Sequence, residues 1–489
     1  MTSPHEKMRY EPVIGLETHI ELQTRSKMFC SCPVVDLTST PPNTAICPVC
    51  TGQPGTLPVV NAKAIEYGYR VAAALNCDLA ERSVFSRKNY FYPDIPKGYQ
   101  ITQFDEPIGQ NGSIVLHTSH GQKLIRIRRV HLEEDTGKLT HLGKGTNSYS
   151  LVDLNRAGVP LLEIVTEPDF RSAEEVRLYA EYLRALVRYL GVNSGDLEKG
   201  VMRIEPNISV RLANNPQLGT KVEIKNLNSF RALERGVAYE IERHIQLLEA
   251  GKKIKQETVG WNEETQKTVS QRSKEDAHDY RYFPEPDLPQ ISVTRIWLDD
   301  LVESLPEPPW VKTERFHHQY KLKLNESWQL ASDQNMSDAF EAVIKSTPTL
   351  SSRVVFAWIT GDIYALLAGR GLSFIDLPVS PLQIGELLGL LADGIINQPT
   401  AKIVLSEMFS SGKSPRTIVS EKNLGQVSDQ GLLTNLITEV IKENPSEVES
   451  YRSGKINIFH YLFGQVMNKV QGKANPQIVR EELERILHQ

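Results

Sequence analysis

The segment VIGLETHIEL, residues 13 to 22, alternates like a β-strand with one apolar and one polar face. Residues two apart in a strand project to the same side of the sheet. The apolar side holds Ile14, Leu16, Thr18, Ile20 and Leu22, and the polar side holds Gly15, Glu17, His19 and Glu21. A face with two carboxylates and an imidazole indicates either a solvated sheet surface or part of a ligand site.

Similar segments recur through the first 290 residues, between glycine and proline breaks. They are LIRIRRVHLEED (124–135), YSLVDLNR (149–156), PLLEIVTE (160–167), MRIEPNISVRL (202–212) and KVEIKNL (221–227). Lys221, Glu223 and Lys225 oppose apolar residues in the last of these. Because an antiparallel sheet can leave one face open, the sequence predicts a β-rich domain with a large polar concavity.

Two amphipathic helices interrupt these strands. The first starts at Ser172, with Glu175 in the position that completes a capping box, and stops at Gly191. The second runs from near Ser229 to Gly251. Their apolar residues recur at spacings of three and four, so we expect both helices to pack against the sheet.

The chain has 489 residues, too many for one hydrophobic core, and its composition changes twice. Helical patterns follow the proline-rich segment LPEPPW (305–310), and a second break comes at SSGKSPR (410–416). The predicted fold is α+β and multidomain. It comprises an antiparallel β-rich cradle domain (1–293), an all-α helical domain (294–409) and a small helical tail domain (410–489).

Net charge and apolar runs exclude some classes of protein. The net charge of −5 argues against binding nucleic acid through bulk positive charge, although a local basic groove remains possible. No apolar run reaches the roughly 20 residues of a membrane span, and the first residues do not form a signal peptide. We therefore expect a cytoplasmic protein without membrane association.

Four of the five cysteines lie within 21 residues, as a C-x-C pair and a C-x-x-C pair: Cys30, Cys32, Cys47 and Cys50. Two thiolate pairs on short turns can complete a tetrahedral Zn²⁺ site. A disulfide is disfavoured without a secretory signal, and a CPVC redox motif leaves the first pair unexplained. Because four cysteines close the coordination shell, the predicted zinc is structural.

Two further acidic groups add to the polar face of residues 13–22. The run Glu133–Glu134–Asp135 ends a basic strand, and Glu163 and Glu167 share one side of another. Clustered carboxylates repel one another unless a cation neutralises them. Mg²⁺ takes one or two protein carboxylates and leaves its other positions to water and phosphates, so the groups predict a nucleotide–magnesium site on an open sheet.

The segment RKNYFYPDIPKGYQITQFD (87–105) interleaves basic and aromatic residues. Such side chains can meet phosphates and stack on bases, but a loop that covers a core has the same composition. The common nucleotide signatures are missing: Gly412-Lys413-Ser414 lacks the upstream glycine of a phosphate-binding loop. Nor does the sequence show a nucleophile set for releasing ammonia.

Several long segments resemble the family of B subunits of the aspartyl/glutamyl-tRNA(Asn/Gln) amidotransferases, the GatB family. They are EPVIGLETHIEL, CSCP with CPVC, RKNYFYPDIPKGYQITQFDEPI, HLEEDTGK, VDLNRAGVPLLEIVTEPD, GVMRIEPNISVR, GTKVEIKNLNSFRALERGVAYEIERH and SKEDAHDYRYFPEPDLP. They are spread over residues 10 to 290, and the helical remainder is also similar to the family. Thr18 replaces a usual aliphatic residue and Thr136 a common alanine, and neither change puts the activity in doubt.

The resemblance implies a glutamine-dependent carbon–nitrogen ligase (EC 6.3.5.-) of protein biosynthesis, built as a heterotrimer of A, B and C subunits. The A subunit frees ammonia. The B subunit uses ATP and Mg²⁺ to phosphorylate the side-chain carboxylate of misacylated Glu-tRNA(Gln) or Asp-tRNA(Asn). Ammonia then displaces phosphate to give Gln-tRNA(Gln) or Asn-tRNA(Asn).

The resemblance also implies roles for particular residues. The catalytic magnesium ligands would be Glu17, His19, Glu133 and Glu163, with Glu133 chosen from the acidic run. Contacts to the nucleotide or the acceptor end would come from Lys88, Tyr92, Lys97 and Tyr99. Zinc would be held by Cys30, Cys32, Cys47 and Cys50.

The tail would contact the tRNA backbone through Lys413, Arg416, Lys469 and Lys473, with Lys455 as a further candidate. Residues 411–489 carry ten basic and nine acidic residues, so an ordinary solvated surface remains an alternative. The rival to the whole assignment is a non-catalytic tRNA-binding scaffold. An aminoacyl-tRNA synthetase is disfavoured, because GLETH is not its nucleotide-binding signature and no KMSKS-like segment follows.

Overall fold

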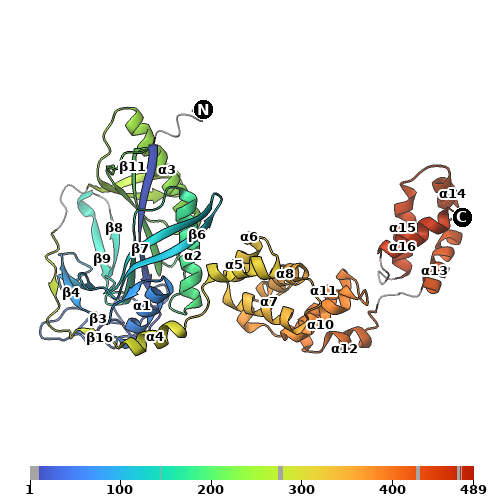
Figure 1. The fold of residues 1–489 in the computed structure, drawn as a ribbon, viewed down its shortest axis with the longest axis horizontal. Helices are drawn as coiled ribbons and strands as arrows, with labels where there is room; N and C mark the ends of the chain where they lie inside the picture. The colour runs from blue at the N-terminus through green and yellow to red at the C-terminus, as the bar shows by residue number, and fades with distance from the viewer. Residues whose placement is uncertain are drawn as a thin grey trace. The chain divides into compact units, whose positions relative to one another are not determined.

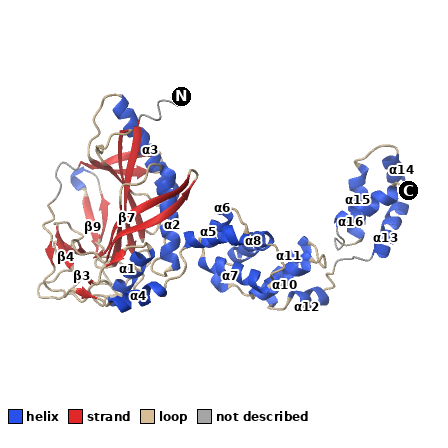
Figure 2. Cartoon of the chain, viewed as in Figure 1, coloured by secondary structure: helices blue, strands red, loops and turns tan. Residues whose placement is uncertain are grey.

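The structure is a computed structural model that describes residues 10–143, 145–273, 279–425, 430–470, 474 and 476–488. It divides into two compact units, Met1–Val311 and Lys312–Gln489. The described strands lie in the first unit, and the described part of the second is built from helices (Figures 1 and 2). This is the predicted α+β, multidomain class. No helix of the described residues is both long and apolar enough to cross a membrane.

The first unit is organised around a sheet of 12 strands, with β1 near its middle. The strands of this sheet are β1 (Tyr10–Glu21), β2 (Asp78–Leu79), β4 (Phe85–Asn89), β5 (Tyr99–Gln103), β6 (Gly109–Thr118), β7 (Gly121–Glu134), β10 (Pro160–Thr166), β11 (Met202–Leu212), β12 (Val222–Lys225), β13 (Glu257–Asn262), β14 (Lys267–Ser273) and β15 (Phe283–Pro284). Their order is β14-β13-β12-β11-β1-β10-β7-β5-β4-β15, with β6 paired to β7 and to β2. Only β12 and β13 pair in parallel among the described strands.

Four shorter strands form two separate ribbons in the same unit. The strands β3 (Arg82–Ser83) and β16 (Ile291–Ser292) pair with each other, as do β8 (Lys138–Leu142) and β9 (Tyr149–Asp153). A 3₁₀ turn, η1 (Gly145–Asn147), lies between β8 and β9. The segments predicted as strands in the first 290 residues thus form strands, although 149–156 belongs to a ribbon and not to the main sheet.

The apolar side of β1 faces the core, as its alternation predicts. Ile14, Leu16, Thr18 and Ile20 are at most 1% exposed. The helices α1 (Ala62–Ala74), α2 (Ala173–Tyr189) and α3 (Phe230–Glu249) contact the strands β7, β6 and β11, respectively. Three helices therefore pack against the sheet, including the two that the sequence predicts.

The ends of α2 and α3 follow the sequence signals, with one difference. Ser172 accepts a hydrogen bond from the N–H of Glu175, and Ser229 accepts one from the N–H of Ala232. The carboxylate of Glu175, however, accepts from the N–H of Arg171 and not from that of Ser172, so the predicted capping box does not close. Gly191 and Gly251 follow the two helices with positive φ angles, the backbone that favours glycine.

The helix α4 (Arg295–Glu303) packs on α1 in the first unit, where the rings of Tyr69 and Trp297 lie 5.5 Å apart. The helices that follow are α5 (Pro309–Tyr320), α6 (Leu324–Ala331), α7 (Gln334–Ser346), α8 (Ser352–Trp358), α9 (Tyr364–Gly369), α10 (Pro381–Ala392), α11 (Gln398–Ser411), α12 (Pro415–Glu421), α13 (Gln430–Glu443), α14 (Pro445–Arg452), α15 (Ile458–Lys469) and α16 (Pro476–Leu487). A π-helical turn, η2 (Ile359–Ile363), joins α8 to α9, and a 3₁₀ turn, η3 (Phe374–Asp376), precedes α10.

The second unit has two separate clusters of buried apolar side chains. One extends from Phe316 to Ile418, and the other from Leu433 to Leu487. Because Ile418 lies in α12, that helix packs with the first cluster. The described part of the unit therefore holds two helical cores, one that includes α12 and one that begins with α13.

Candidate active site and cysteine cluster

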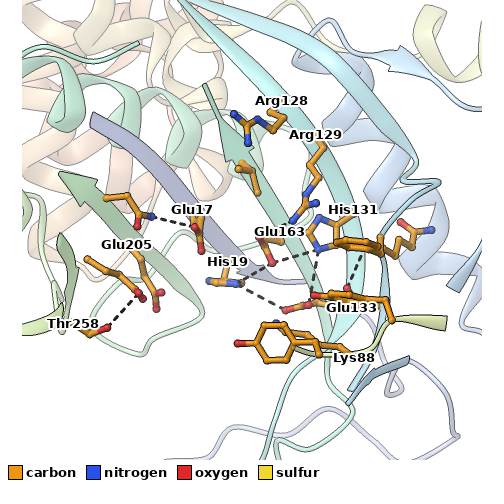
Figure 3. Close-up of a pocket in the computed structure, with 18 of the residues that line it drawn as sticks. Glu17, His19, Lys88, Arg128, Arg129, His131, Glu133, Glu163, Glu205 and Thr258 are labelled. Atoms are coloured by element: carbon orange, nitrogen blue, oxygen red, sulfur yellow. Dashed lines mark hydrogen bonds and ion pairs between the residues drawn. The ribbon is translucent and has the colours of Figure 1, made fainter. Parts of the chain in front are cut away.

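A cavity of about 600 Å³ opens on the polar face of the sheet (Figure 3). Its walls come from strands far apart in the sequence, from β1 to β14. The charged and imidazole residues that line it are Glu17, His19, Lys88, Arg128, Arg129, His131, Glu133, Glu163, Glu205, Lys221, Glu223 and Lys225. The polar concavity predicted from strand alternation is therefore present.

Strand register brings the central group together. His19 of β1 lies opposite Glu163 of β10, which lies opposite His131 of β7. One row further along the strands, Glu133 of β7 faces Thr102 of β5. Because side chains alternate between faces, these residues project into the same cavity.

Two imidazoles and two carboxylates form the centre of the cavity. The Nε2 of His19 lies 3.5 Å from Glu163 Oε2 and 3.9 Å from Glu133 Oε1. The Nε2 of His131 lies 3.3 Å from Glu163 Oε2 and 4.0 Å from Glu133 Oε2. Each carboxylate is thus placed between two rings, and Figure 3 shows the four side chains pointing toward one another.

The charges in this centre are mutually supporting. Burial of the His19 imidazole opposes protonation, but its hydrogen bond with Glu163 and the nearby carboxylates raise its pKa to about 9. Burial likewise opposes ionisation of Glu163, yet the charge and hydrogen bond of His131, aided by His19, hold the pKa of Glu163 well below its usual range. His19 must therefore release a proton before it can coordinate a metal ion.

The donor atoms of this centre fit a divalent cation. His19, Glu133 and Glu163 each offer one ligand atom, and the three atoms lie within 4.8 Å of one another. Glu133 Oε2 and His19 Nδ1 are buried and have no hydrogen-bond partner among the described residues. Two carboxylates with one imidazole suit a hard cation such as Mg²⁺ or Mn²⁺.

Glu17 lines the same cavity but lies outside this three-residue set. It accepts a hydrogen bond of 3.1 Å from the side-chain amide of Asn207. Burial, followed by the charges of Glu163 and Glu223, raises its pKa. Nearby, the ammonium of Lys225 lies 3.1 Å from both Glu205 and Glu223. Of the four predicted magnesium ligands, three form a compact set and the fourth is a neighbour.

Sequence reasoning does not single out His131. The residue lies two positions before Glu133 on β7, so alternation places both on one face. In the sequence this segment is a basic strand with an acidic end, and the imidazole of His131 does not stand out within it. Residues 131 and 133 are two positions apart in one strand and so project to the same face. That spacing is the signal that could have identified His131.

The acidic residues next to the centre serve other contacts. Glu134 forms an ion pair with Lys97, and Asp135 accepts a 2.7 Å hydrogen bond from Arg203. Glu167 lies beyond the end of β10 and pairs with Arg128 at 2.9 Å. Alternation explains the first case: Glu134 projects to the opposite side from Glu133.

The four predicted contacts to the nucleotide or acceptor end lie in three places. Lys88 lines the central cavity. Lys97 and Tyr99 instead line a smaller cavity of about 240 Å³ beside Cys30 and Cys50. Tyr92 lines an open aromatic cavity that also includes Tyr90, Phe91, Tyr280 and Phe283. The structure therefore separates Lys88 from the other predicted contacts, although Tyr280 lines both the central and the aromatic cavity.

The four cysteines of the two sequence pairs come together, with one sulfur ligand atom each within 4.8 Å of the others: Cys30, Cys32, Cys47 and Cys50. A hydrogen bond from Cys30 lowers the pKa of the Cys50 thiol to about 4, and the backbone N–H of Cys47 and the charge of Lys27 act in the same direction. This set of soft ligands fits a tetrahedral Zn²⁺ ion.

Lys27 is a fully buried partner of this cluster, and its side chain is 0% exposed. Its ammonium lies 3.6 Å from the Sγ of Cys50 and donates to the carbonyl of Leu154 at 3.2 Å. A buried ammonium needs nearby negative charge. Its position therefore fits a thiolate at Cys50 better than a neutral thiol.

The predicted tRNA contacts in the tail have acidic partners. Lys413 pairs with Glu421 at 2.6 Å, and Arg416 with Glu386 at 3.0 Å. Lys469 lies 3.2 Å from Glu439 and 2.8 Å from Glu443. Lys473 lies outside the described residues. Gly412 caps α11 and Ser414 caps α12, so the GKS segment forms a turn between helices.

Known protein families and individual relatives match this chain over most of its length. Residues 12–299 match the GatB/GatE catalytic domain family, and residues 338–487 match the GatB domain family. The chain is similar to the B subunit of the aspartyl/glutamyl-tRNA(Asn/Gln) amidotransferase of Persephonella marina, with 46% identity over 98% of this chain and 100% of the relative. The B subunits of the same name from Caldanaerobacter subterraneus (47% identity; 97% and 100%) and Thermotoga maritima (45%; 98% and 99%) are similarly related.

Proposed function

The chain belongs to the family of the B subunits of aspartyl/glutamyl-tRNA(Asn/Gln) amidotransferases, and we propose that its central cavity activates a carboxylate on misacylated tRNA. The substrate is Glu-tRNA(Gln) or Asp-tRNA(Asn), and the products are Gln-tRNA(Gln) or Asn-tRNA(Asn). The activity is that of a carbon–nitrogen ligase with glutamine as the amide donor. One observation carries the proposal: His19, Glu133 and Glu163 converge in a cavity that is also lined by lysine and arginine.

The chemistry requires activation because a carboxylate is a poor electrophile. In the proposed first step, a side-chain carboxylate oxygen attacks the γ-phosphorus of ATP, and the bond to the ADP oxygen breaks. Ammonia then attacks the carbonyl carbon of the acyl phosphate, inorganic phosphate leaves, and a proton is lost from nitrogen. Phosphoryl transfer depends mainly on positioning and on neutralising phosphate oxygens.

The cavity has the groups that this chemistry needs. His19, Glu133 and Glu163, with Glu17 beside them, would hold Mg²⁺, which when bound neutralises phosphate oxygens and favours attack at phosphorus. His131 orients Glu163 through the 3.3 Å contact, and Arg129 approaches Glu163 at 3.9 Å. Lys88 lies beyond Glu133, in position to meet the negative charge of the acceptor end or of the phosphates.

We propose A and C subunits as partners, because the name of the relatives denotes one subunit of a larger enzyme. The A subunit would free ammonia, a step for which this sequence shows no nucleophile set. We assign structural Zn²⁺ to the cysteine cluster and tRNA-backbone contacts to the tail. Because the proposed reaction acts on aminoacyl-tRNA, we propose that the complex works in the cytoplasm.

The test uses the complex of the three subunits with Glu-tRNA(Gln), γ-labelled ATP and Mg²⁺, without glutamine. Phosphate release is followed in the wild type, His19→Ala and Glu163→Gln, and tRNA binding is measured alongside. A matched control is His141→Ala, which removes an exposed histidine of β8. We expect release to depend on misacylated tRNA and to fall at least about 100-fold in both cavity variants, with tRNA binding retained.

The alternative, a non-catalytic tRNA-binding scaffold, predicts the reverse pattern. The same two substitutions would then change tRNA affinity and leave ATP turnover as it is in the wild type. That outcome would remove the catalytic assignment from this cavity.

A further inference from the structure

One wall of the central cavity comes from the segment that includes β15, residues 280–287, which we call the strap. Tyr280 and Tyr282 of the strap line the cavity together with Lys88 and Phe104. The ring of Tyr282 stacks on that of Phe104, with the ring centroids 3.8 Å apart and the planes 3° from parallel. The strap thus gives the cavity an aromatic wall.

The ammonium of Lys88 faces two tyrosine rings. Its Nζ is 5.1 Å from the centroid of the Tyr280 ring and 5.9 Å from that of Tyr90, which are distances of cation–π contacts. It makes no hydrogen bond or ion pair with the residues that the structure describes. Burial opposes the charge of Lys88, but Glu133 and Tyr282 raise its pKa above the ordinary value. The place of this cation in the cavity therefore depends on the rings, and most directly on Tyr280.

The first end of the strap is fixed to β4 by Asn89. Its backbone N–H donates to the carbonyl of Tyr280 at 2.9 Å, and its side-chain amide donates to the carbonyl of Arg281 at 2.8 Å. Arg281 has a φ of 45°, a left-handed backbone that residues other than glycine seldom adopt. Such a conformation persists where the surrounding contacts determine it. The turn between the two tyrosines therefore requires that the strap be held in place.

The second end of the strap is held by an ion pair between Arg87 and Glu285. The Nε and Nη2 of Arg87 donate to the two carboxylate oxygens of Glu285, each at 2.7 Å, and Nη2 also donates to Asp287 at 3.2 Å. Paired hydrogen bonds between charged groups are among the strongest in proteins. The side chain of Glu285 is 0% exposed, so loss of Arg87 would leave a buried carboxylate without its cation.

This ion pair lies on the opposite side of β4 from the cavity. Arg87 and Lys88 are neighbours on the strand, and neighbouring side chains project to opposite faces. Lys88 lines the central cavity, whereas Arg87 and Glu285 are not among the described residues that line it. The guanidinium lies instead over the ring of Tyr99, at 4.3 Å. The pair can therefore act on the reaction in that cavity through the strap that it holds.

We propose that Arg87 and Glu285 are positioning residues, whose ion pair clamps the strap on β4. The clamp places the ring of Tyr280 and so holds the Lys88 ammonium toward the carboxylate–imidazole centre. This inference rests on the proposed function, in which Lys88 meets the negative charge of the phosphates or of the acceptor end. A lysine has a flexible stem, and phosphoryl transfer depends on positioning, so a fixed ring beside the ammonium raises the rate.

The test is a double-mutant cycle in the complete three-subunit complex, with Arg87→Met, Lys88→Met and the two substitutions together. Phosphate release from γ-labelled ATP is measured with saturating misacylated tRNA, which gives kcat. We expect Arg87→Met to lower kcat about tenfold when Lys88 is present, and less than about twofold in the Lys88→Met background. Such dependence on Lys88 distinguishes positioning of the lysine from general support of the fold.

Glu285→Gln tests the same clamp from its other side and keeps the shape of the side chain. We expect a smaller loss with the same dependence on Lys88, because the amide oxygen can still accept from Arg87. The matched control is Arg211→Met. The side chains of Arg211 and Arg87 are both 20% exposed, but Arg211 pairs with Glu11 at 2.8 Å, outside the strap. This control should leave kcat unchanged.

Two results would overturn the inference. One is a kcat in Arg87→Met equal to that of the wild type, and the other is a loss of the same size with and without Lys88. If Arg87→Met does not fold, Glu285→Gln decides by the same two criteria. Failure of the proposed function has a different signature, namely phosphate release that survives His19→Ala. If release requires His19 while Arg87 and Lys88 act independently, only the clamp is wrong.

Discussion

At the scale of single residues, buried charge is the most informative feature of the molecule. His19, His131, Glu133 and Glu163 compensate one another, and the ammonium of Lys27 lies beside Cys50, whose pKa is lowered. A polar group without compensation would cost several kcal/mol at such depth. Each of these groups can therefore stay buried only while its partners are present. Removing one member of a set tests how strongly the others depend on it.

Removal of the ammonium of Lys27 should weaken the proposed zinc site. In Lys27→Met the buried side chain keeps its length but loses the charge beside Cys50. Loss of an outer contact of this kind lowers metal affinity by about 10- to 100-fold. The measurement is the zinc content per chain and the rate of zinc transfer to a chromogenic chelator.

The control for this prediction is Lys199→Met, which removes a lysine that is half exposed and pairs with Asp36 at 3.1 Å. Equal zinc retention in Lys27→Met and wild type would show that the ammonium does not support the cluster.

A second buried set should make the stability of the first unit depend on pH. Burial opposes ionisation of Glu240, but the imidazole of His244, 3.3 Å away, and hydrogen bonds from Arg243 and Thr268 lower its pKa to about 2. Because the folded pKa lies below the ordinary value of 4.5, the carboxylate stabilises the fold above pH 4.5, and this contribution is lost as pH falls from 4.5 toward 2.

Glu240→Gln should therefore lower the free energy of unfolding by about 3 kcal/mol at pH 7. Urea denaturation at pH 7 and at pH 4 measures the effect, and the gap between variant and wild type should narrow at the lower pH. A gap that stays constant would mean that the hydrogen-bond geometry, and not the charge, accounts for the loss.

At the scale of elements, short-range pattern predicted the central strands of the sheet, β1, β7, β10, β11 and β12, and two of the helices that pack on it. The alternation of residues 13–22 and the caps at Ser172 and Ser229 depend on neighbours in sequence, and the structure has them. Strand alternation and the family resemblance together predicted the carboxylates of the centre and His19. The sequence therefore contained the faces of the strands it predicted and the starts of the two helices α2 and α3, but it did not predict α1 (Ala62–Ala74).

The strand order could not be obtained in the same way, because pairing joins strands that are far apart in the sequence, and β1 pairs with residues more than 100 positions away. His131 belongs to the centre only through the pairing of β7 with β10. Lys97 and Tyr99 lie beside the cysteines although their segment also contains Lys88 of the central cavity. Side chains of one continuous segment thus line different cavities, and composition alone cannot separate them.

The N-cap of α3 provides a test at this scale. Ser229→Ala removes the oxygen that accepts from the N–H of Ala232, and an unsatisfied N-cap costs about 1 kcal/mol. Urea denaturation of the full chain, followed by tryptophan fluorescence, should show this loss. Ser229→Asp should restore the stability, because aspartate caps equally well; failure of the rescue would show that the serine has another role.

At the scale of the whole molecule, the two units have separate cores. The apolar clusters of the second unit extend from Phe316 to Ile418 and from Leu433 to Leu487. No strand of the described residues beyond Val311 takes part in the sheet. The helical unit should therefore fold independently of the catalytic sheet.

A fragment of residues 312–489 tests that independence. We expect it to be monomeric, with the far-ultraviolet circular dichroism of a helical protein and a cooperative thermal transition. Treatment of the full chain with a zinc chelator should lower the unfolding temperature of the first unit and leave the fragment's transition unchanged. A fragment without cooperative unfolding would show that its cores depend on the first unit.

The central place of β1 has a consequence for synthesis on the ribosome. This strand emerges before the strands it pairs with, and one of these, β11, pairs Leu212 with Tyr10 and is made some 200 residues later. At elongation rates of about 5–20 residues per second, the delay is roughly 10–40 s. Through that interval the apolar side of the first strand has no finished sheet to enter. The nascent chain is thus a natural client for a chaperone that binds apolar segments near the tunnel exit.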